Sequence, residues 1–128
     1  MFGRDKKSEP AVRGGWGEKQ AEKYLLHHGF SLVSRNFRCK TGEIDLIMQE
    51  ADGSLVFVEV KARRSEMFTA AEEVINTSKK RRLKRAARYF LSRYPSSQDR
   101  PLRFDVVLVM GEEKNSTLQI RHYRNVFR

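Results

Sequence analysis

The chain has few cysteines and histidines, the residues that stabilise folds through disulfides or zinc. Its 128 residues include one cysteine, Cys39, which excludes an internal disulfide and fits a reducing, cytoplasmic environment. With three histidines scattered along the sequence, a Cys/His zinc site is not expected. No run approaches the ~18 to 20 consecutive apolar residues that span a bilayer, and no apolar segment follows the basic N-terminal residues. We therefore expect neither a membrane span nor a secretory signal.

Acidic residues are scarce relative to basic ones. The chain has 16 Asp and Glu against 26 Lys and Arg, which gives a formal net charge of +10. Such an excess favours nucleic acid or another polyanion as the partner. An anionic membrane surface is the rival interpretation, but no amphipathic stretch rich in Trp, Phe and Leu supports it. We predict that the partner is nucleic acid, namely DNA.

Apolar periodicity and turn residues predict a flexible basic tail over 1–13 and a single domain over 14–128. The first helix is expected from about Gly15 to His28, where Gly29 can take a left-handed conformation and end it. A second helix is expected over 76–94, and strands over 30–37, 43–50, 54–63, 102–110 and 118–123. The order α-β-β-β-α-β-β predicts an α/β fold with a central mixed sheet flanked by helices.

Four charged residues interrupt two otherwise apolar strands. Glu43 and Asp45 lie in the first strand, and Glu59 and Lys61 in the second. The loop 51–53 between them is a hairpin signal, with glycine where a positive φ is needed. The register of this hairpin places Asp45 opposite Glu59 and Glu43 opposite Lys61. We therefore predict one sheet face that carries all four charges.

The even positions of the same strands, from Ile44 to Met48 and from Val56 to Val60, are predicted to form the uniformly apolar opposite face. Directly opposed carboxylates, with Cβ atoms about 4.5–5.5 Å apart, repel each other unless a cation or a proton intervenes. A hard divalent ion with oxygen ligands, Mg²⁺ above all, would relieve the repulsion. A same-face ion pair between Glu59 and Lys61 is the plain alternative, although it leaves the other two carboxylates without partners.

Each flanking helix adds a charged residue on its apolar face. Glu18 has this position in the first helix, and Lys79 in the second. Both residues also have plain interpretations. Glu18 would suit a solvated first helical turn, where the helix dipole favours an acid, and Lys79 would suit a solvated surface.

The second helix begins with a run of basic residues. Cations near a helix N-terminus oppose the helix dipole, so a role in binding phosphate is the hypothesis and a solvated face the alternative. No motif that reads base sequence is present, and one tryptophan does not make a stacking platform. The predicted nucleic-acid-binding residues are Lys79, Lys80, Arg81, Arg82, Lys84, Arg85, Arg38, Lys40 and Arg63.

Asp105 interrupts a further apolar strand, and we interpret it as a structural partner of Arg103. The three histidines are interpreted as ordinary surface or core residues, and Cys39 as a thiol at a strand end. None of these residues is expected to take part in the candidate site.

The two strand motifs resemble the PD-(D/E)xK nuclease superfamily, in which an Asp on one strand and a Glu-x-Lys on the next build a metal site. Asp45 matches the Asp, 59–61 matches the Glu-x-Lys, and Ile44 stands where the motif has proline. Glu18 resembles the additional helical glutamate of the archaeal Holliday-junction resolvase branch. More closely, the chain is similar over 14–110 to the YraN-like family of uncharacterised bacterial proteins. The resemblance implies a restriction-endonuclease-like fold and a nuclease.

The expected activity is that of a metal-dependent endonuclease that hydrolyses phosphodiester bonds in DNA, including structured or branched DNA. Asp45, Glu59 and Glu18 are expected to hold Mg²⁺ or Mn²⁺, and Lys61 to act on the attacking water. Two further charges are expected beside these residues: Glu43 and Lys79. The twofold symmetry of branched DNA would favour a homodimer. The alternative is a non-catalytic nucleic-acid-binding module that uses the same basic surface.

Overall fold

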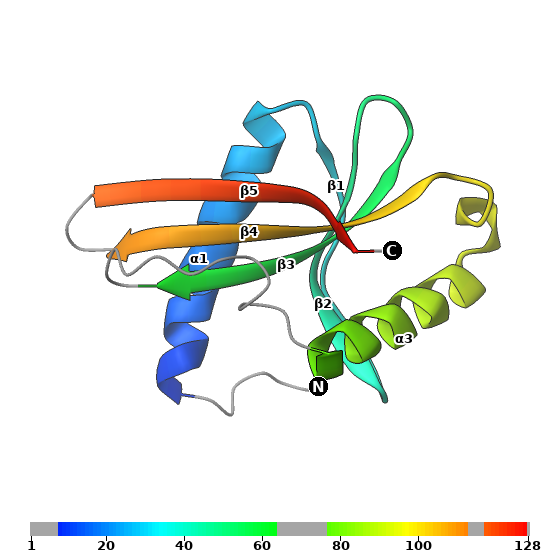
Figure 1. Cartoon of the computed structure of the whole chain (residues 1–128), viewed down its shortest axis with the longest axis horizontal. Coiled ribbons are helices and arrows are strands. Elements are labelled where there is room, and N and C mark those ends of the chain that lie inside the picture. Colours follow the sequence, from blue (N-terminus) through cyan, green and yellow to red (C-terminus); the bar gives the residue numbers. More distant parts are fainter. Residues whose placement is uncertain (1–7, 64–76, 113–116, 128) are drawn as a thin grey trace.

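The computed structural model of the chain describes residues 8–63, 77–112 and 117–127 (Figure 1). Two α-helices, one short 3₁₀ helix and five strands follow one another in these ranges. In chain order they are α1 Ser8–His27, β1 Ser31–Cys39, β2 Gly42–Gln49, β3 Leu55–Arg63, α3 Thr77–Arg93, η1 Pro95–Ser97, β4 Leu102–Glu112 and β5 Thr117–Phe127. The predicted order α-β-β-β-α-β-β is confirmed.

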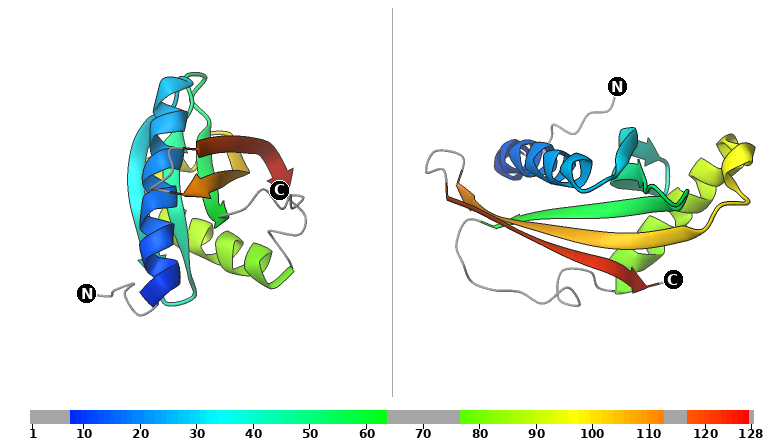
Figure 2. Two further views of the ribbon diagram at one scale, coloured as in Figure 1. Left: turned by 90° about the vertical axis from the view of Figure 1, so that its left-hand side faces the viewer. Right: turned by 90° about the horizontal axis from the view of Figure 1, so that it is seen from above.

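The strands form one five-stranded sheet in the order β1-β2-β3-β4-β5. Strands β3 and β4 are parallel, and every other neighbouring pair is antiparallel. The connection from β3 to β4 contains α3, as a parallel crossover requires. Helix α1 packs on one face of the sheet and α3 on the other (Figure 2). The predicted mixed sheet flanked by helices is therefore confirmed.

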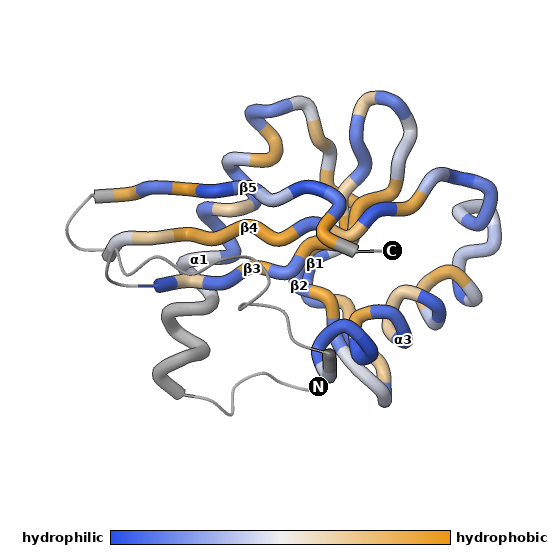
Figure 3. The backbone as a smooth tube through the Cα atoms, viewed as in Figure 1, coloured by the Kyte–Doolittle hydropathy of each residue, from blue (hydrophilic) through white to orange (hydrophobic). Residues whose placement is uncertain are grey.

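Apolar side chains on both faces of β2, β3 and β4 bury the sheet between two cores. Leu46, Met48, Val56 and Val58 pack with α1, and an alternating set that includes Phe57 packs with α3. The tube in Figure 3 shows the result, with nearly continuous apolar colour along the middle strands and polar colour along the first turns of α3. Such two-sided burial is typical of central strands covered by helices. No helix in the described ranges is long and apolar enough to cross a membrane.

The first helix begins earlier than predicted. It starts at Ser8, so residues 8–13 are helical and the prediction of a flexible tail over 1–13 is wrong for them; residues 1–7 lie outside the described part. Pro10 is compatible with this start because the first turn of a helix needs no N–H donor there. The predicted stop is confirmed, since Gly29 has φ +90°.

Candidate active site

The hairpin that carries the strand motifs has the predicted register. Gln49 pairs with Leu55, and the ladder continues to the pair Leu46–Val58. Gly53 has φ +94°, as the turn requires. Asp45 and Glu59 follow directly after the last pair, at the point where β2 and β3 stop exchanging backbone hydrogen bonds.

The sheet is irregular at Asp45. On its other side β2 pairs Leu46 with Arg35 and Ile44 with Phe37, and within the described ladders no pair is formed by Asp45 itself. Asn36, which would face Asp45, has φ +49° and interrupts the extended backbone. Because the strands separate here, the Asp45 carboxylate reaches across the gap, and Oδ2 accepts a 2.8 Å hydrogen bond from the backbone N–H of Val60.

This irregularity corrects two details of the sequence analysis. Ile44 does not share a face with Leu46, because it packs with Ile47 in the core under α3. The predicted pair of Glu43 with Lys61 lies beyond the end of the ladder, and Glu43 instead forms an ion pair with Arg38 at 3.1 Å. The four charged residues of the two strands are therefore not held in regular cross-strand pairs.

Three other carboxylates act on Asp45. Its side chain is partly buried, and its pKa lies well above the usual value. Burial is the largest cause, followed by the negative charges of Glu59 and Glu18 and, more weakly, of Glu43, against the opposing effect of the Val60 N–H. The structure thus brings the predicted helical glutamate to the two strand carboxylates.

A close approach of α1 to β3 positions Glu18. A Cβ on Gly17 would lie 3.0 Å from the Cβ of Ala62, so glycine lets the helix pack directly on the strand. Glu18 follows immediately and is partly buried between the two elements. Sequence reasoning overlooked Gly17, although a glycine inside a helical pattern signals such close packing.

Lys79 extends from the first turn of α3 to the strand motif. Its Nζ lies 2.8 Å from Oε2 of Glu59, and the two side chains are 27% and 11% exposed. The pKa of Lys61, two residues further along β3, is lowered first by burial and then by the positive charges of Lys79 and Arg63. The interpretation of Lys79 as a solvated surface residue is therefore wrong.

A cleft of about 500 Å³ lies between α3 and the β1–β2 turn. Its lining includes the acidic residues Glu43, Asp45 and Glu59 and the basic residues Arg38, Lys40, Lys79 and Arg82, whereas Glu18 and Lys61 are not part of it. Gly42 packs directly against the backbone of α3, because a Cβ at this position would lie only 2.6 Å from the carbonyl oxygen of Arg82. The β1–β2 turn can rest on the backbone of α3 only with glycine at this position.

The remaining predicted nucleic-acid residues are distributed around the cleft. Helix α3 carries no acidic residue, and Lys80, Arg81 and Arg85 are exposed on it, whereas Lys84 is partly buried. Arg63 is partly buried at the end of β3 and donates a 3.5 Å hydrogen bond to the carbonyl oxygen of Ala62. The structure therefore gathers four of the predicted basic residues at the cleft and leaves the others on the outer side of α3 and at the end of β3.

The donor chemistry of the cleft suits a hard divalent cation, since the converging groups are carboxylate oxygens. Within the described ranges, however, no three Asp, Glu, His or Cys side chains are arranged to hold a metal ion. Glu59 is paired with Lys79, and Asp45 accepts from Val60. Asp45, Glu59 and Glu18 fit the predicted metal by chemical type, and Oε2 of Glu59 is the oxygen that Lys79 contacts.

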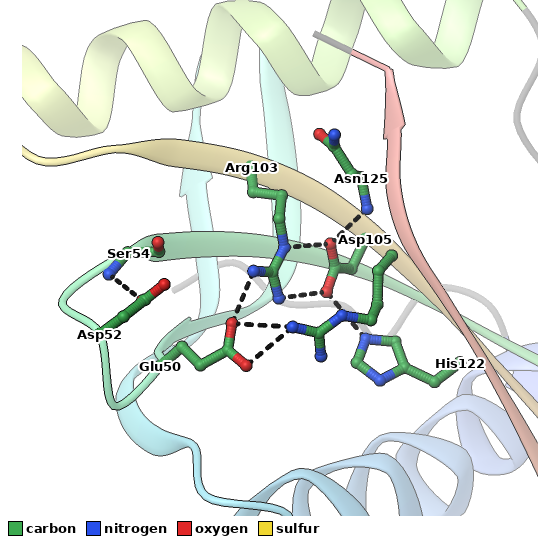
Figure 4. A network of polar contacts seen from close by, with 8 residues as sticks. Glu50, Asp52, Ser54, Arg103, Asp105, His122 and Asn125 are labelled. Carbon is green, nitrogen blue, oxygen red and sulfur yellow. Dashed lines mark hydrogen bonds and ion pairs between the residues drawn. The ribbon is translucent and has the colours of Figure 1, made fainter.

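A second polar cluster joins the turn between β2 and β3 to β4 and β5 (Figure 4). Arg103 donates to both oxygens of Asp105 at 2.9 and 3.0 Å, which confirms the predicted structural pairing, and to Glu50 at 2.6 Å. His122 Nε2 donates to Asp105 at 2.8 Å, and the backbone N–H of Asn125 donates at 2.9 Å. Burial alone would raise the pKa of Asp105, but these hydrogen bonds outweigh it and hold the pKa below its usual value.

Comparison with known proteins identifies relatives over most of the chain. A model of the uncharacterised protein family UPF0102 matches residues 17–109. A UPF0102 protein of Caldicellulosiruptor saccharolyticus is 44% identical over 114 residues, covering 89% of this chain and 95% of the relative. Among solved structures, the EndoMS-dsDNA2 complex matches with a TM-score of 0.38 and 22% identity, over 80% of this chain and 39% of that one. SfsA of Pyrococcus furiosus in complex with Ca²⁺ matches with a TM-score of 0.37 and 14% identity, over 88% of this chain and 62% of that one.

Proposed function

This chain belongs to the uncharacterised protein family UPF0102, and we propose that it is a metal-dependent endonuclease that hydrolyses phosphodiester bonds in DNA. One observation carries the proposal. Asp45 is partly buried among the charges of Glu59, Glu18 and Glu43, in a cleft whose walls are basic. Like charges gathered at a partly buried position destabilise a fold, and they are typical of functional sites.

Asp45 and Glu59 would hold Mg²⁺ or Mn²⁺, with Glu18 as a further ligand, directly or through a water. When bound, the metal would polarise the phosphoryl oxygen and lower the pKa of its coordinated water. The backbone N–H of Val60 fixes the orientation of Asp45 through its hydrogen bond to Oδ2. Glu59 would accept the metal in place of the ammonium group of Lys79, which neutralises it in the structure described here.

The cationic residues would act on the substrate. Lys61, on the strand beside Glu59, would orient the attacking water and stabilise the negative charge that develops on the phosphate. Arg38, Lys40 and Arg82 line the walls of the cleft, where they would bind the flanking phosphates. Lys79, once displaced from Glu59, would add to this set. Contacts of this kind are independent of base sequence, so structured or branched DNA would be distinguished by shape.

Hydrolysis of a panel of labelled linear, nicked, flapped and four-way DNAs, with Mg²⁺ or Mn²⁺, tests the proposal. Wild type is expected to cleave at least one substrate. Asp45→Asn is expected to lower the cleavage rate by more than about a hundredfold. Removing a residue that only supports a metal ligand typically lowers activity by about 10- to 100-fold, and removing the ligand itself should lower it further. Asp99→Asn removes an exposed aspartate before β4 and should cleave like wild type. The proposed endonuclease activity would be refuted if wild type and Asp45→Asn cleaved equally fast, or if neither cleaved any substrate.

A calorimetric titration with Mn²⁺ separates metal binding from turnover. Wild type should bind Mn²⁺ with measurable heat, and Asp45→Ala should not. Asp99→Ala is the matched control, since this residue is exposed and absent from the lining of the cleft. Identical titrations for wild type and Asp45→Ala would contradict the assignment of the ligands.

The second candidate is a nucleic-acid-binding module without turnover. It is favoured by the ion pair between Lys79 and Glu59, and by the lack of a ready three-ligand group in the described part of the chain. This function predicts salt-dependent DNA binding that survives Glu59→Ala and needs no metal. The double variant Lys80→Glu with Arg81→Glu should abolish binding, whereas Lys19→Glu with Lys23→Glu, which reverses two exposed charges on α1, should weaken it much less. Equal affinity of the two double variants would exclude α3 as the interface.

A further inference from the structure

One side of α3 carries a row of residues that starts at the cleft. Arg82, Arg85, Tyr89 and Arg93 are spaced by three or four residues, so they follow one another along the same side of the helix. Arg82 lines the cleft, and the row continues toward the C-terminal end of α3. At 1.5 Å per residue, Tyr89 lies about 10 Å from Arg82 along the axis, roughly three nucleotide steps of a stacked strand.

Tyr89 is the aromatic member of this row, and its environment holds the ring in place. Tyr89 is 41% exposed as a residue, and the centroid of its ring lies 6.1 Å from that of Phe37 on β1. Arg93 donates a 3.1 Å hydrogen bond to the Tyr89 hydroxyl, and its guanidinium lies 5.8 Å from the ring centroid. The ring is therefore fixed on two sides and still presents a substantial surface to solvent.

We propose that Tyr89 stacks on an unpaired base of a DNA strand whose phosphates follow the basic row on α3 into the cleft. The inference rests on the proposed binding of nucleic acid and adds the class of substrate: a strand with unpaired nucleotides beside the site of cleavage. Exposed aromatic rings within basic tracks bind single strands in this way, because every base has a π-face. In a duplex the same faces are covered by neighbouring base pairs, so the contact selects unpaired DNA.

Charge on the helix supports this occupant. Helix α3 contains no acidic residue from Thr77 to Arg93, and Arg85 and Arg88 are exposed on the turn before Tyr89. An apolar protein partner would find a surface dominated by cations, whereas a polyanion with aromatic bases complements both features. The competing explanation is that Tyr89 only covers Phe37.

The chain offers a matched control. Tyr94 is also an exposed tyrosine, at 50%, but it follows the last turn of α3 and packs against Phe90 with centroids 4.7 Å apart. It lies outside the row that leads to the cleft. General effects of removing an exposed tyrosine should therefore appear equally in Tyr89→Ala and Tyr94→Ala, whereas stacking should appear only in the first.

Fluorescence anisotropy with metal-free protein in EDTA tests the proposal, using a labelled oligothymidine, an abasic strand with the same number of phosphates, and a blunt duplex. Tyr89→Ala is expected to weaken oligothymidine binding roughly five- to a hundredfold, and to leave the abasic strand and the duplex unaffected. Tyr89→Phe should bind like wild type, because it keeps the ring. Tyr89→Leu should lose as much as Tyr89→Ala while it keeps an apolar contact with Phe37, so loss of fold cannot produce the pattern.

The outcomes separate this inference from the proposed function. The binding assay contains no metal, so it does not depend on cleavage. If wild type binds oligothymidine but cleaves no substrate in the cleavage panel, the endonuclease fails and the variants of Tyr89 still decide the stacking contact. Equal losses on oligothymidine and the abasic strand, an unaffected Tyr89→Ala, or an equal loss in Tyr94→Ala would overturn the stacking contact alone. Failure of wild type to bind any of the three DNAs in EDTA would overturn the stacking contact and the metal-independent binding module, whereas the endonuclease stands or falls with the cleavage panel.

Discussion

The two polar clusters of this protein, one around Asp45 and one around Asp105, handle buried charge in opposite ways. Asp105 receives hydrogen bonds from Arg103, His122 and the backbone N–H of Asn125, and its pKa is lowered despite burial. Asp45 receives one backbone N–H and faces three carboxylates, and its pKa is raised by burial and by those charges. Both aspartates interrupt apolar strands, so the strand pattern alone does not distinguish them.

The difference lies in the partners. A buried carboxylate surrounded by cations and donors is stabilised in its charged form, and such a cluster supports the fold. A carboxylate surrounded by other carboxylates is strained in its charged form until a cation arrives. The first arrangement connects β4, β5 and the β2–β3 hairpin, and the second lies where β2 and β3 separate. Each of the following predictions changes one of these regions and leaves the other intact.

The largest effect is expected from Asp105→Asn. The substitution removes the charge that Arg103 faces and leaves a nearly buried guanidinium, 14% exposed, with Glu50 as its only other carboxylate in the described network. Breaking a buried ion pair from one side should lower the free energy of unfolding by about 3 kcal/mol. Urea denaturation followed by circular dichroism measures it. Asp99→Asn, at an exposed position, should change the value by less than about 0.5 kcal/mol, and a similar small change in Asp105→Asn would refute the structural role.

Gly42→Ala should have the next largest effect. The new Cβ would lie 2.6 Å from the backbone carbonyl of Arg82, so the β1–β2 turn must move away from α3. Overpacking of this kind should cost about 2 kcal/mol of stability and should also weaken DNA binding by displacing Arg38 and Lys40 from the cleft. Gly15→Ala is the matched control, because no atom lies within 4 Å of the added Cβ and the helix should be stabilised by up to about 1 kcal/mol. Equal stability of the two variants would contradict the close approach.

Much of the fold follows from local pattern. The apolar alternation of 43–50 and 54–63, with glycine in the loop, determined the hairpin and its register over the pairs Leu46–Val58 to Gln49–Leu55. The prediction failed from Asp45 onward, because the ladder ends there and Asn36 on β1 adopts a left-handed φ. Such an interruption depends on contacts between strands rather than on the sequence period of either one.

The parts of the site that sequence reasoning missed depend on contacts between distant segments. Glu50 and Arg103 are separated by 53 positions, and nothing local to either one indicates the pairing. Helical periodicity likewise does not indicate the contact of Gly42 with the backbone of Arg82 or that of Tyr89 with Phe37, because both join α3 to a distant part of the chain. By contrast, Glu18 was placed correctly, because its spacing from the apolar residues of α1 determines its face.

Acid should weaken the cluster around Asp105. Its folded-state pKa is lower than the usual carboxyl value, so its stabilising contribution is complete above about pH 4 and is lost as the pH falls through the folded pKa. Glu50 behaves alike, since burial that would raise its pKa is outweighed by Arg124 and Arg103. The free energy of unfolding should therefore fall as the pH is lowered through that range, by at most about 1.4 kcal/mol per pH unit and per group. In Asp105→Asn the slope measured by urea denaturation should be smaller, and an unchanged slope would assign the acid sensitivity elsewhere.

The smallest effect, and the one opposite in sign, is expected from Asp45→Asn in metal-free buffer. The amide keeps an oxygen that can accept from Val60 and removes the charge that Glu59, Glu18 and Glu43 oppose. Because the folded-state pKa of Asp45 is raised, this residue opposes folding at pH values above the usual carboxyl pKa, so the variant should be more stable at neutral pH by about 1 kcal/mol. The gain should vanish below the usual carboxyl pKa of about 4, where Asp45 is protonated in both states. Thermal unfolding at neutral and acidic pH measures both, and destabilisation as large as that of Asp105→Asn would mean that Asp45 also serves the fold.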